Sequence, residues 1–417
     1  MMMENDQSFE DFMGDTYQES VELAQTALDR GDDQLALELA EECLEEKQFD
    51  VEVLNICAVA ATNLDDLVKA QGLFVKALQL NPRNGALHHN YAVLLDRKRD
   101  FGAAVKHLQK ALELQPDFPE AYINLGNVLD ELDRSDEALN CYHEALHRMP
   151  DSPDAFYNIG YACNRLGRYE EAQSNFLRAL ELRPDDAGSL NGVGFALANQ
   201  QHLDDAQGYY DRAIELDPAN ATYLFNRGLL KNRLGQYPEA RTDFLKALEI
   251  DTDFFEALIE LLSVLVELQR YDEATSYLER AEQLDPQSPE PPFFRALLSE
   301  RQGNVAQALE YLDVCLQRDP GSLQVQNNKG NILLGLKRFD EALACFDCIL
   351  EKDPDYALAH FNRACVLAQR GDLDGSVIAL TRALELEPDL SEEISEDPDF
   401  APLKSDARFE KLLRTAE

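Results

Sequence analysis

Residues 121–151 read AYINLGNVLDELDRSDEALNCYHEALHRMPD. Apolar residues recur in this stretch at spacings of three and four, in two runs at 121–132 and 136–148. Such spacing predicts two amphipathic helices, each with one apolar face. A short polar turn separates the runs, and Pro150 ends the second one because proline lacks the N–H that a helix interior needs. The stretch therefore predicts a helical hairpin.

The hairpin recurs with a period of 34 residues, which divides residues 17–390 into eleven repeats. The twentieth place is Ala in ten of the eleven repeats, and the eighth place is mostly Gly or Ala, which allows helix backbones to approach closely. Because one hairpin cannot bury its apolar face alone, the repeats must stack. The thirty-second place of repeats 2–11 is marked by Pro82, Pro116, Pro150, Pro184, Pro218, Thr252, Pro286, Pro320, Pro354 and Pro388.

The pattern of residues 121–151 resembles the tetratricopeptide repeat (TPR) family, and the resemblance covers residues 17–390. It implies an all-α fold, an α-α superhelix or solenoid of about eleven hairpins, whose first helices line a concave groove. We expect residues 1–16 to form an acidic, disordered N-terminus and residues 391–417 to cap the last hairpin. Residues 252–300 depart from the repeat pattern, so we expect an irregular superhelix there.

Charge excludes several classes of function. The 417 residues include 38 Lys+Arg and 79 Asp+Glu, a net charge of −41. A surface this acidic disfavours nucleic-acid phosphates and anionic membranes as partners. The start of the chain is acidic and lacks the apolar core of a secretory signal, so we expect a cytoplasmic protein. No phosphate-binding glycine loop or dinucleotide turn occurs in the sequence, and no cofactor is expected.

Asparagine is unusually frequent at the sixth place, where it fills six of eleven repeats although it is a mediocre helix former. An amide offers two donors and an acceptor oxygen, so a row of amides can hydrogen-bond an extended peptide backbone. The row resembles the asparagine ladder of the TPR superhelix in O-linked N-acetylglucosamine transferases, without the catalytic domain. The amides could instead bridge neighbouring hairpins, and the two roles are compatible. The candidate groove amides are Asn90, Asn124, Asn127, Asn158, Asn226, Asn328, Asn331 and Asn362.

Arginine recurs at the thirteenth place of every second repeat, as Arg97, Arg165, Arg233 and Arg301. In a groove, these guanidinium groups could pair with ligand carboxylates. Salt bridges between adjacent repeats are the alternative.

An apolar stretch in the irregular region gives a second candidate surface. Residues 254–268 read FFEALIELLSVLVEL and are apolar around most of a helix. Such a helix is either deeply buried or covered by a partner. One expectation is a binding site, either for a partner protein or for a second copy of the chain in a homo-oligomer. The alternative is a local irregularity in the pitch of the superhelix. The residues of this apolar patch are Phe225, Ile259, Val266, Phe293 and Phe294.

One motif suggests an enzyme. His143, Glu144 and His147 match H-E-x-x-H, in which two histidines on one helix face bind zinc and the glutamate acts as a base. The segment also coincides with the framework of the repeat, which favours a structural interpretation. The sequence thus favours a non-catalytic scaffold or adaptor that holds an extended segment of a partner protein. The alternatives are a zinc-dependent hydrolase and a self-assembling structural protein.

Overall fold

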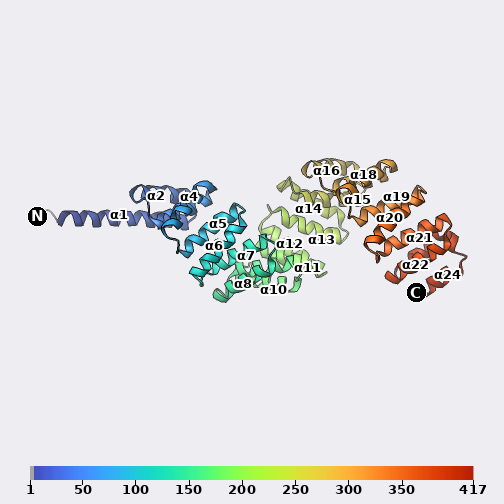
Figure 1. Ribbon diagram of the computed structural model, residues 1–417, viewed down its shortest axis with the longest axis horizontal. Helices are drawn as coiled ribbons and strands as arrows, with labels where there is room; N and C mark the ends of the chain where they lie inside the picture. The colour runs from blue at the N-terminus through green and yellow to red at the C-terminus, as the bar shows by residue number, and fades with distance from the viewer. Residues whose placement is uncertain (1–3, 417) are drawn as a thin grey trace. The chain divides into compact units, whose positions relative to one another are not determined.

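A computed structural model describes residues 4–416, and within that range it contains helices and turns but no strand. The chain divides into two compact units, Met1–Ala219 and Asn220–Glu417. Each unit is a stack of helical hairpins (Figure 1). The predicted fold class, an all-α solenoid of helical hairpins, is confirmed.

The N-terminal unit contains six hairpins. Its helices are α1 (Glu4–Asp29), α2 (Asp33–Glu46), α3 (Val51–Asn63), α4 (Leu67–Leu80), α5 (Gly85–Arg97), α6 (Phe101–Leu114), α7 (Pro119–Glu131), α8 (Ser135–Arg148), α9 (Pro153–Arg165), α10 (Tyr169–Leu182), α11 (Ala187–Asn199) and α12 (Leu203–Leu216).

The C-terminal unit contains five hairpins and a closing segment. Its hairpin helices are α13 (Ala221–Arg233), α14 (Tyr237–Ile250), α15 (Phe255–Glu267), α16 (Tyr271–Leu284), α17 (Glu290–Arg301), α18 (Val305–Arg318), α19 (Leu323–Gly335), α20 (Phe339–Lys352), α21 (Ala357–Arg370) and α22 (Leu373–Leu386). The closing segment comprises α23 (Leu390–Glu396), the 3₁₀ helix η1 (Pro398–Leu403) and α24 (Ala407–Ala416).

The two ends of the chain were expected to be a disordered N-terminus and a C-terminal cap. The backbone of residues 4–16, where composition predicts disorder, is helical and continuous with the rest of α1. Residues 1–3 lie outside the described residues. At the other end, Ile394, Phe400, Leu403 and Phe409 are buried against the last hairpin, in one cluster with Phe361.

The turn inside each hairpin has a fixed backbone conformation. The fifteenth place of all eleven repeats has a positive φ, between 57° and 92°. Five repeats place glycine there, which adopts this left-handed region without strain. The other six hold Asp65, Arg99, Asp133, Gln201, Gln269 and Lys337. The turn geometry therefore belongs to the repeat and not to the residue that fills it.

Within each unit the first helices of neighbouring repeats pack side by side. Close backbone contacts join α3 with α5, α5 with α7 and α7 with α9, and likewise α13 with α15 and α15 with α17. The second helices of neighbouring repeats approach one another less closely. A stack whose first helices are closer together than its second helices curves toward the first helices. The first-helix face is thus the inner face of each unit.

The irregular region is explained by burial. On α15, Leu258, Leu261, Leu262 and Leu265 are all fully buried, in a cluster that α14, α16 and α17 complete. The helix can be apolar on most sides because four neighbours, α13, α14, α16 and α17, cover it. No helix within the described residues is both long enough and apolar enough to cross a membrane.

Candidate functional site on the first-helix face

The asparagine row forms hydrogen bonds between successive first helices. Asn90 Nδ2 on α5 donates to Asn55 Oδ1 on α3 over 3.0 Å. Asn124 Nδ2 on α7 donates to His89 Nε2 on α5 over 2.8 Å. In the C-terminal unit Asn362 Nδ2 donates to Asn327 Oδ1 over 2.8 Å. Each of these bonds joins a sixth-place amide to the fifth place of the preceding repeat, 35 residues earlier.

A directional relay results in repeats 2–4. His89 Nδ1 lies 3.0 Å from Asn90 Oδ1, so a neutral imidazole protonated at Nδ1 donates to Asn90 and accepts from Asn124. The donation then runs from Asn124 to His89, from His89 to Asn90 and from Asn90 to Asn55, across three successive first helices. Burial lowers the pKa of His89, which favours this neutral form.

Repeat 5 uses a different partner because the fifth place of repeat 4 is Ile123, which has no acceptor. Asn158 Nδ2 instead donates to Asn127 Oδ1 over 2.9 Å. The Tyr142 hydroxyl lies 3.0 Å from the same Asn127 oxygen and 3.0 Å from Asp130 Oδ2. Burial, followed by the Asp130 carboxylate, raises the pKa of Tyr142.

The bridging interpretation of the amides therefore has direct geometric support, and the bridges use only part of each amide. One N–H of each amide is used in the bridge, which leaves a second N–H and free lone-pair capacity. Asn90, Asn124 and Asn158 remain half-buried, whereas Asn362 is buried. In the C-terminal unit Asn226 and Asn328 are half-buried and Asn331 is exposed, all on first helices.

The arginines contact the preceding repeat through its backbone. Arg97 Nη1 donates to the carbonyl oxygen of Thr62 over 2.8 Å, at the end of α3. Arg165 Nη1 donates to the carbonyl oxygen of Asp130 over 2.8 Å, at the end of α7, and Arg165 also pairs with Asp133. Both guanidinium groups thus donate to a carbonyl at the C-terminal end of a first helix, and each of these carbonyls also accepts a backbone N–H of the following turn. Arg233 and Arg301 are exposed.

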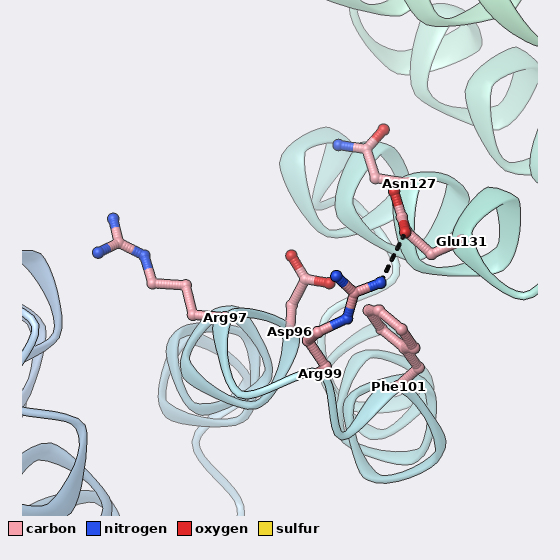
Figure 2. A pocket seen from close by; sticks show the side chains of 6 residues that line it. All are labelled: Asp96, Arg97, Arg99, Phe101, Asn127 and Glu131. Atoms are coloured by element: carbon pink, nitrogen blue, oxygen red, sulfur yellow. Dashed lines mark ion pairs between the residues drawn. The ribbon is translucent and has the colours of Figure 1, made fainter. Parts of the chain in front are cut away.

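A pocket of about 370 Å³ lies where repeats 3 and 4 meet, and Figure 2 shows the side chains that line it. It brings together two of the predicted groove residues, Arg97 and Asn127, although the Arg97 guanidinium points away toward α3. The other lining residues are Asp96, Arg99, Phe101 and Glu131. These four residues could not be singled out from the sequence, because they occupy unrelated places in the repeat and meet only in the folded stack.

The oppositely charged side chains of this pocket are only weakly paired. Arg99 Nη2 lies 4.0 Å from Glu131 Oε2, and both side chains are mostly exposed. The Arg99 guanidinium lies 5.6 Å from the centre of the Phe101 ring. Asp96 makes no side-chain hydrogen bond or ion pair within residues 4–416. Burial and then the Glu131 charge raise the pKa of Asp96, while Arg99 opposes them.

The apolar patch is largely part of the core. Phe294 is only 8% exposed, and Phe225, Ile259 and Val266 pack half-buried against the cluster around α15. Phe293 packs against the next cluster along the unit. Most of the patch therefore packs within the core of its own unit and offers little open apolar surface.

The H-E-x-x-H residues lie on the exposed side of α8. Glu144 is paired with Arg148 over 2.5 Å, and that ion pair lowers the pKa of Glu144. Among the described side chains, the one group of three close metal-binding residues is elsewhere, at Cys365, Asp397 and Asp399. His143 and His147 therefore have no third protein ligand nearby within that range, and catalytic zinc sites use three.

Sequence comparison identifies the class of protein. The family model described as tetratricopeptide repeat matches residues 123–187, 195–253, 255–322 and 327–391, and the model described as TPR repeat matches residues 100–133. These matches cover more than half of the chain, which therefore belongs to the tetratricopeptide repeat family. Proteins of this family are generally scaffolds for protein–protein interaction. No curated protein matches the sequence.

Solved TPR structures are similar to the chain at low identity. Yeast Tom70 is 17% identical, with a TM-score of 0.46 over 92% of this chain and 100% of that one. A tetratricopeptide repeat protein from Parabacteroides merdae is 18% identical, with a TM-score of 0.49 over 60% and 99%. YrrB, described as a TPR protein with an unusual peptide-binding site, is 29% identical, with a TM-score of 0.37 over 44% and 95%.

Proposed function

We propose that this protein is a non-catalytic scaffold that binds an extended segment of a partner protein along the first-helix face of its N-terminal unit. The observation that carries the proposal is the row of half-buried amides on α5, α7 and α9. Their spacing of one repeat lets a single extended chain meet several amides in succession. Such contacts are made to the peptide backbone, so binding depends little on the amino-acid sequence of the segment.

The bridging bonds prepare the row for this role. Asn90 and Asn124 are held in place by the relay through His89, so their orientation is set before a ligand arrives. Ordering side chains in advance reduces the entropy lost on binding. Each amide–peptide hydrogen bond contributes about 0.5–1.5 kcal/mol net, so useful affinity requires several amides.

The test uses a displayed library of unstructured random peptides, selected on the full-length chain. A selected peptide is then titrated against the wild type and against the triple variant Asn90→Ala, Asn124→Ala and Asn158→Ala. Loss of three amide contacts should weaken binding at least about tenfold. Unchanged affinity in the triple variant contradicts the proposal.

A matched control separates binding from stability. The double variant Asn55→Ala and His89→Ala removes the partners of Asn90 and Asn124 but keeps the three amides. It should lower the melting temperature much as the triple variant does, because it also breaks bridges between repeats. Because the relay no longer orders Asn90 and Asn124, its affinity for the peptide should fall by about threefold, clearly less than in the triple variant. An equal loss of affinity in both variants assigns the amides to bridging alone.

A further inference from the structure

The pocket between repeats 3 and 4 holds a cation of the chain itself. Figure 2 shows the Arg99 side chain lying between the Asp96 and Glu131 carboxylates, with the Phe101 ring beside it. Its guanidinium is 4.0 Å from Glu131 and 5.6 Å from the Phe101 ring centre. Carboxylates and an aromatic ring are the groups that recognise a guanidinium, through charge-assisted hydrogen bonds and stacking.

Arg99 fills this place weakly. Its side chain is 78% exposed, and its partner Glu131 is 57% exposed. An exposed pair at 4.0 Å contributes little to stability. Arg99 also stands at the turn between α5 and α6, with φ of 58°, so its position follows from the turn and not from the pocket. The Asp96 residue is half-buried, and its carboxylate makes no hydrogen bond or ion pair with the described side chains.

Resting on the proposed function, we propose that this pocket binds an arginine side chain of the partner segment, in the place that Arg99 now occupies. The arriving guanidinium pairs with Asp96 and Glu131 and lies along Phe101, while Arg99 swings out into solvent. Asn127, in the same pocket, accepts from Asn158 of the amide row, so a segment on that row passes the pocket. The net charge of −41 steers a cationic segment toward the protein.

The probes are three five-residue peptides with blocked ends, alanines around a central arginine, citrulline or lysine. Each is titrated at low salt into the full-length chain and followed by NMR. Citrulline keeps the shape of arginine and removes its charge, so the arginine peptide should bind about tenfold more tightly. Lysine lacks the planar fork and should bind more weakly than arginine. Equal binding of arginine and citrulline, or of arginine and lysine, overturns the proposal.

Two variants should act in opposite directions on the arginine peptide. Asp96→Asn removes a carboxylate and should weaken binding about fivefold or more, whereas Arg99→Gln removes the internal competitor and should tighten binding about threefold or more. The control Arg168→Gln deletes one positive charge from an exposed pair with Glu171, outside the pocket, and should change affinity by less than twofold. Weaker or unchanged binding in Arg99→Gln, or tightening as large in Arg168→Gln, contradicts the proposal.

The same titrations distinguish this proposal from the proposed function. If arginine and citrulline peptides bind equally and both lose affinity in the triple asparagine variant, the pocket assignment fails and the amide row stands. If the preference for arginine persists while the triple variant binds both peptides like the wild type, the pocket stands and the row fails.

Discussion

Gly126 on α7 faces the ring of Tyr142 on α8 so closely that a Cβ added to Gly126 would lie 2.3 Å from Tyr142 Cε1. The relationship recurs between the eighth and twenty-fourth places of other repeats. Wherever the eighth place is glycine, the twenty-fourth is an aromatic residue. The pairs are Gly126 with Tyr142, Gly160 with Phe176, Gly194 with Tyr210, Gly228 with Phe244 and Gly330 with Phe346.

We therefore expect Gly126→Ala to destabilise the protein by about 1–3 kcal/mol, because Tyr142 is 1% exposed and cannot yield to the added methyl group. Denaturant unfolding measures the effect. Gly208→Ala is the control, since that glycine lies inside α12 with nothing within 4 Å of an added Cβ, and it should stabilise by about 0.5–1 kcal/mol. The double variant Gly126→Ala and Tyr142→Leu should recover stability, because repeat 3 pairs Ala92 with Leu108. A stabilising Gly126→Ala would contradict this packing rule.

The left-handed turn gives a prediction of opposite sign. Gln269 has φ of 57°, a conformation that costs a non-glycine residue about 1 kcal/mol. Gln269→Gly should therefore stabilise the chain by about 0.5–1 kcal/mol in thermal or denaturant unfolding. Gly303→Ala, at φ of 81° in the equivalent turn, should destabilise it. If both substitutions changed the stability in the same direction, the left-handed turn conformation would not be the cause of the effect.

A buried charge cluster in the C-terminal unit predicts a large loss. Asp243 is 1% exposed and binds Arg227 through both oxygens, at 2.6 and 2.8 Å, and Lys231 at 2.7 Å. Asp243→Ala leaves two cations without this partner and should destabilise by about 3–5 kcal/mol. The exposed pair of Arg338 and Glu341 is the control, and Glu341→Ala should have no measurable effect on the denaturant midpoint.

Acid should weaken repeat 3 through a histidine pair. His88 Nε2 lies 3.1 Å from the Pro82 carbonyl oxygen, so it donates there, and His88 Nδ1 accepts from His107 Nδ1 over 2.8 Å. The bond needs an unprotonated Nδ1 on His88, and a neutral His107 ring donates to it without placing a positive charge beside His88. Burial, and then His88, lower the pKa of His107 below its usual value of 6.5.

Because the unfolded chain binds the proton more readily, the stability from neutral His107 is complete above about pH 6.5 and is lost as the pH falls below it. Acidification also relieves the repulsion of a net charge of −41, so the difference between the wild type and His107→Gln is the quantity to follow. That difference, from urea midpoints at pH 7.5 and 5.5, should shift in favour of the variant at pH 5.5. A constant difference would contradict the neutral pair.

The fold could be predicted from the sequence because the same residue types recur at the same places in successive repeats. Ala at the twentieth place allows close helix contact, and Pro150 and its equivalents mark the end of each hairpin. A departure in one repeat, such as Thr252, therefore does not obscure the period. The partners of the asparagine row were harder to foresee. They depend on the fifth place, where Asn55, His89 and Asn327 offer acceptors and Ile123 does not.

The pocket could not be predicted from the sequence, since Asp96, Arg99 and Glu131 belong to three different places and two repeats. Whether the apolar run at 254–268 faced a partner or the core was also undecided by pattern alone. Hydrophobicity on all sides is the same for a helix covered by its own chain and for one covered by another, and Leu262 and Leu265 prove to be covered by their own chain.

The central claim is that the amides of Asn90, Asn124 and Asn158 contact the backbone of a bound segment. The most direct measurement is the side-chain ¹H–¹⁵N NMR signals of these three residues, assigned by substitution, in the free chain and with a selected peptide bound. We predict that all three shift and that their second N–H exchanges more slowly with solvent in the complex. A peptide that binds while these signals stay unchanged would contradict the account.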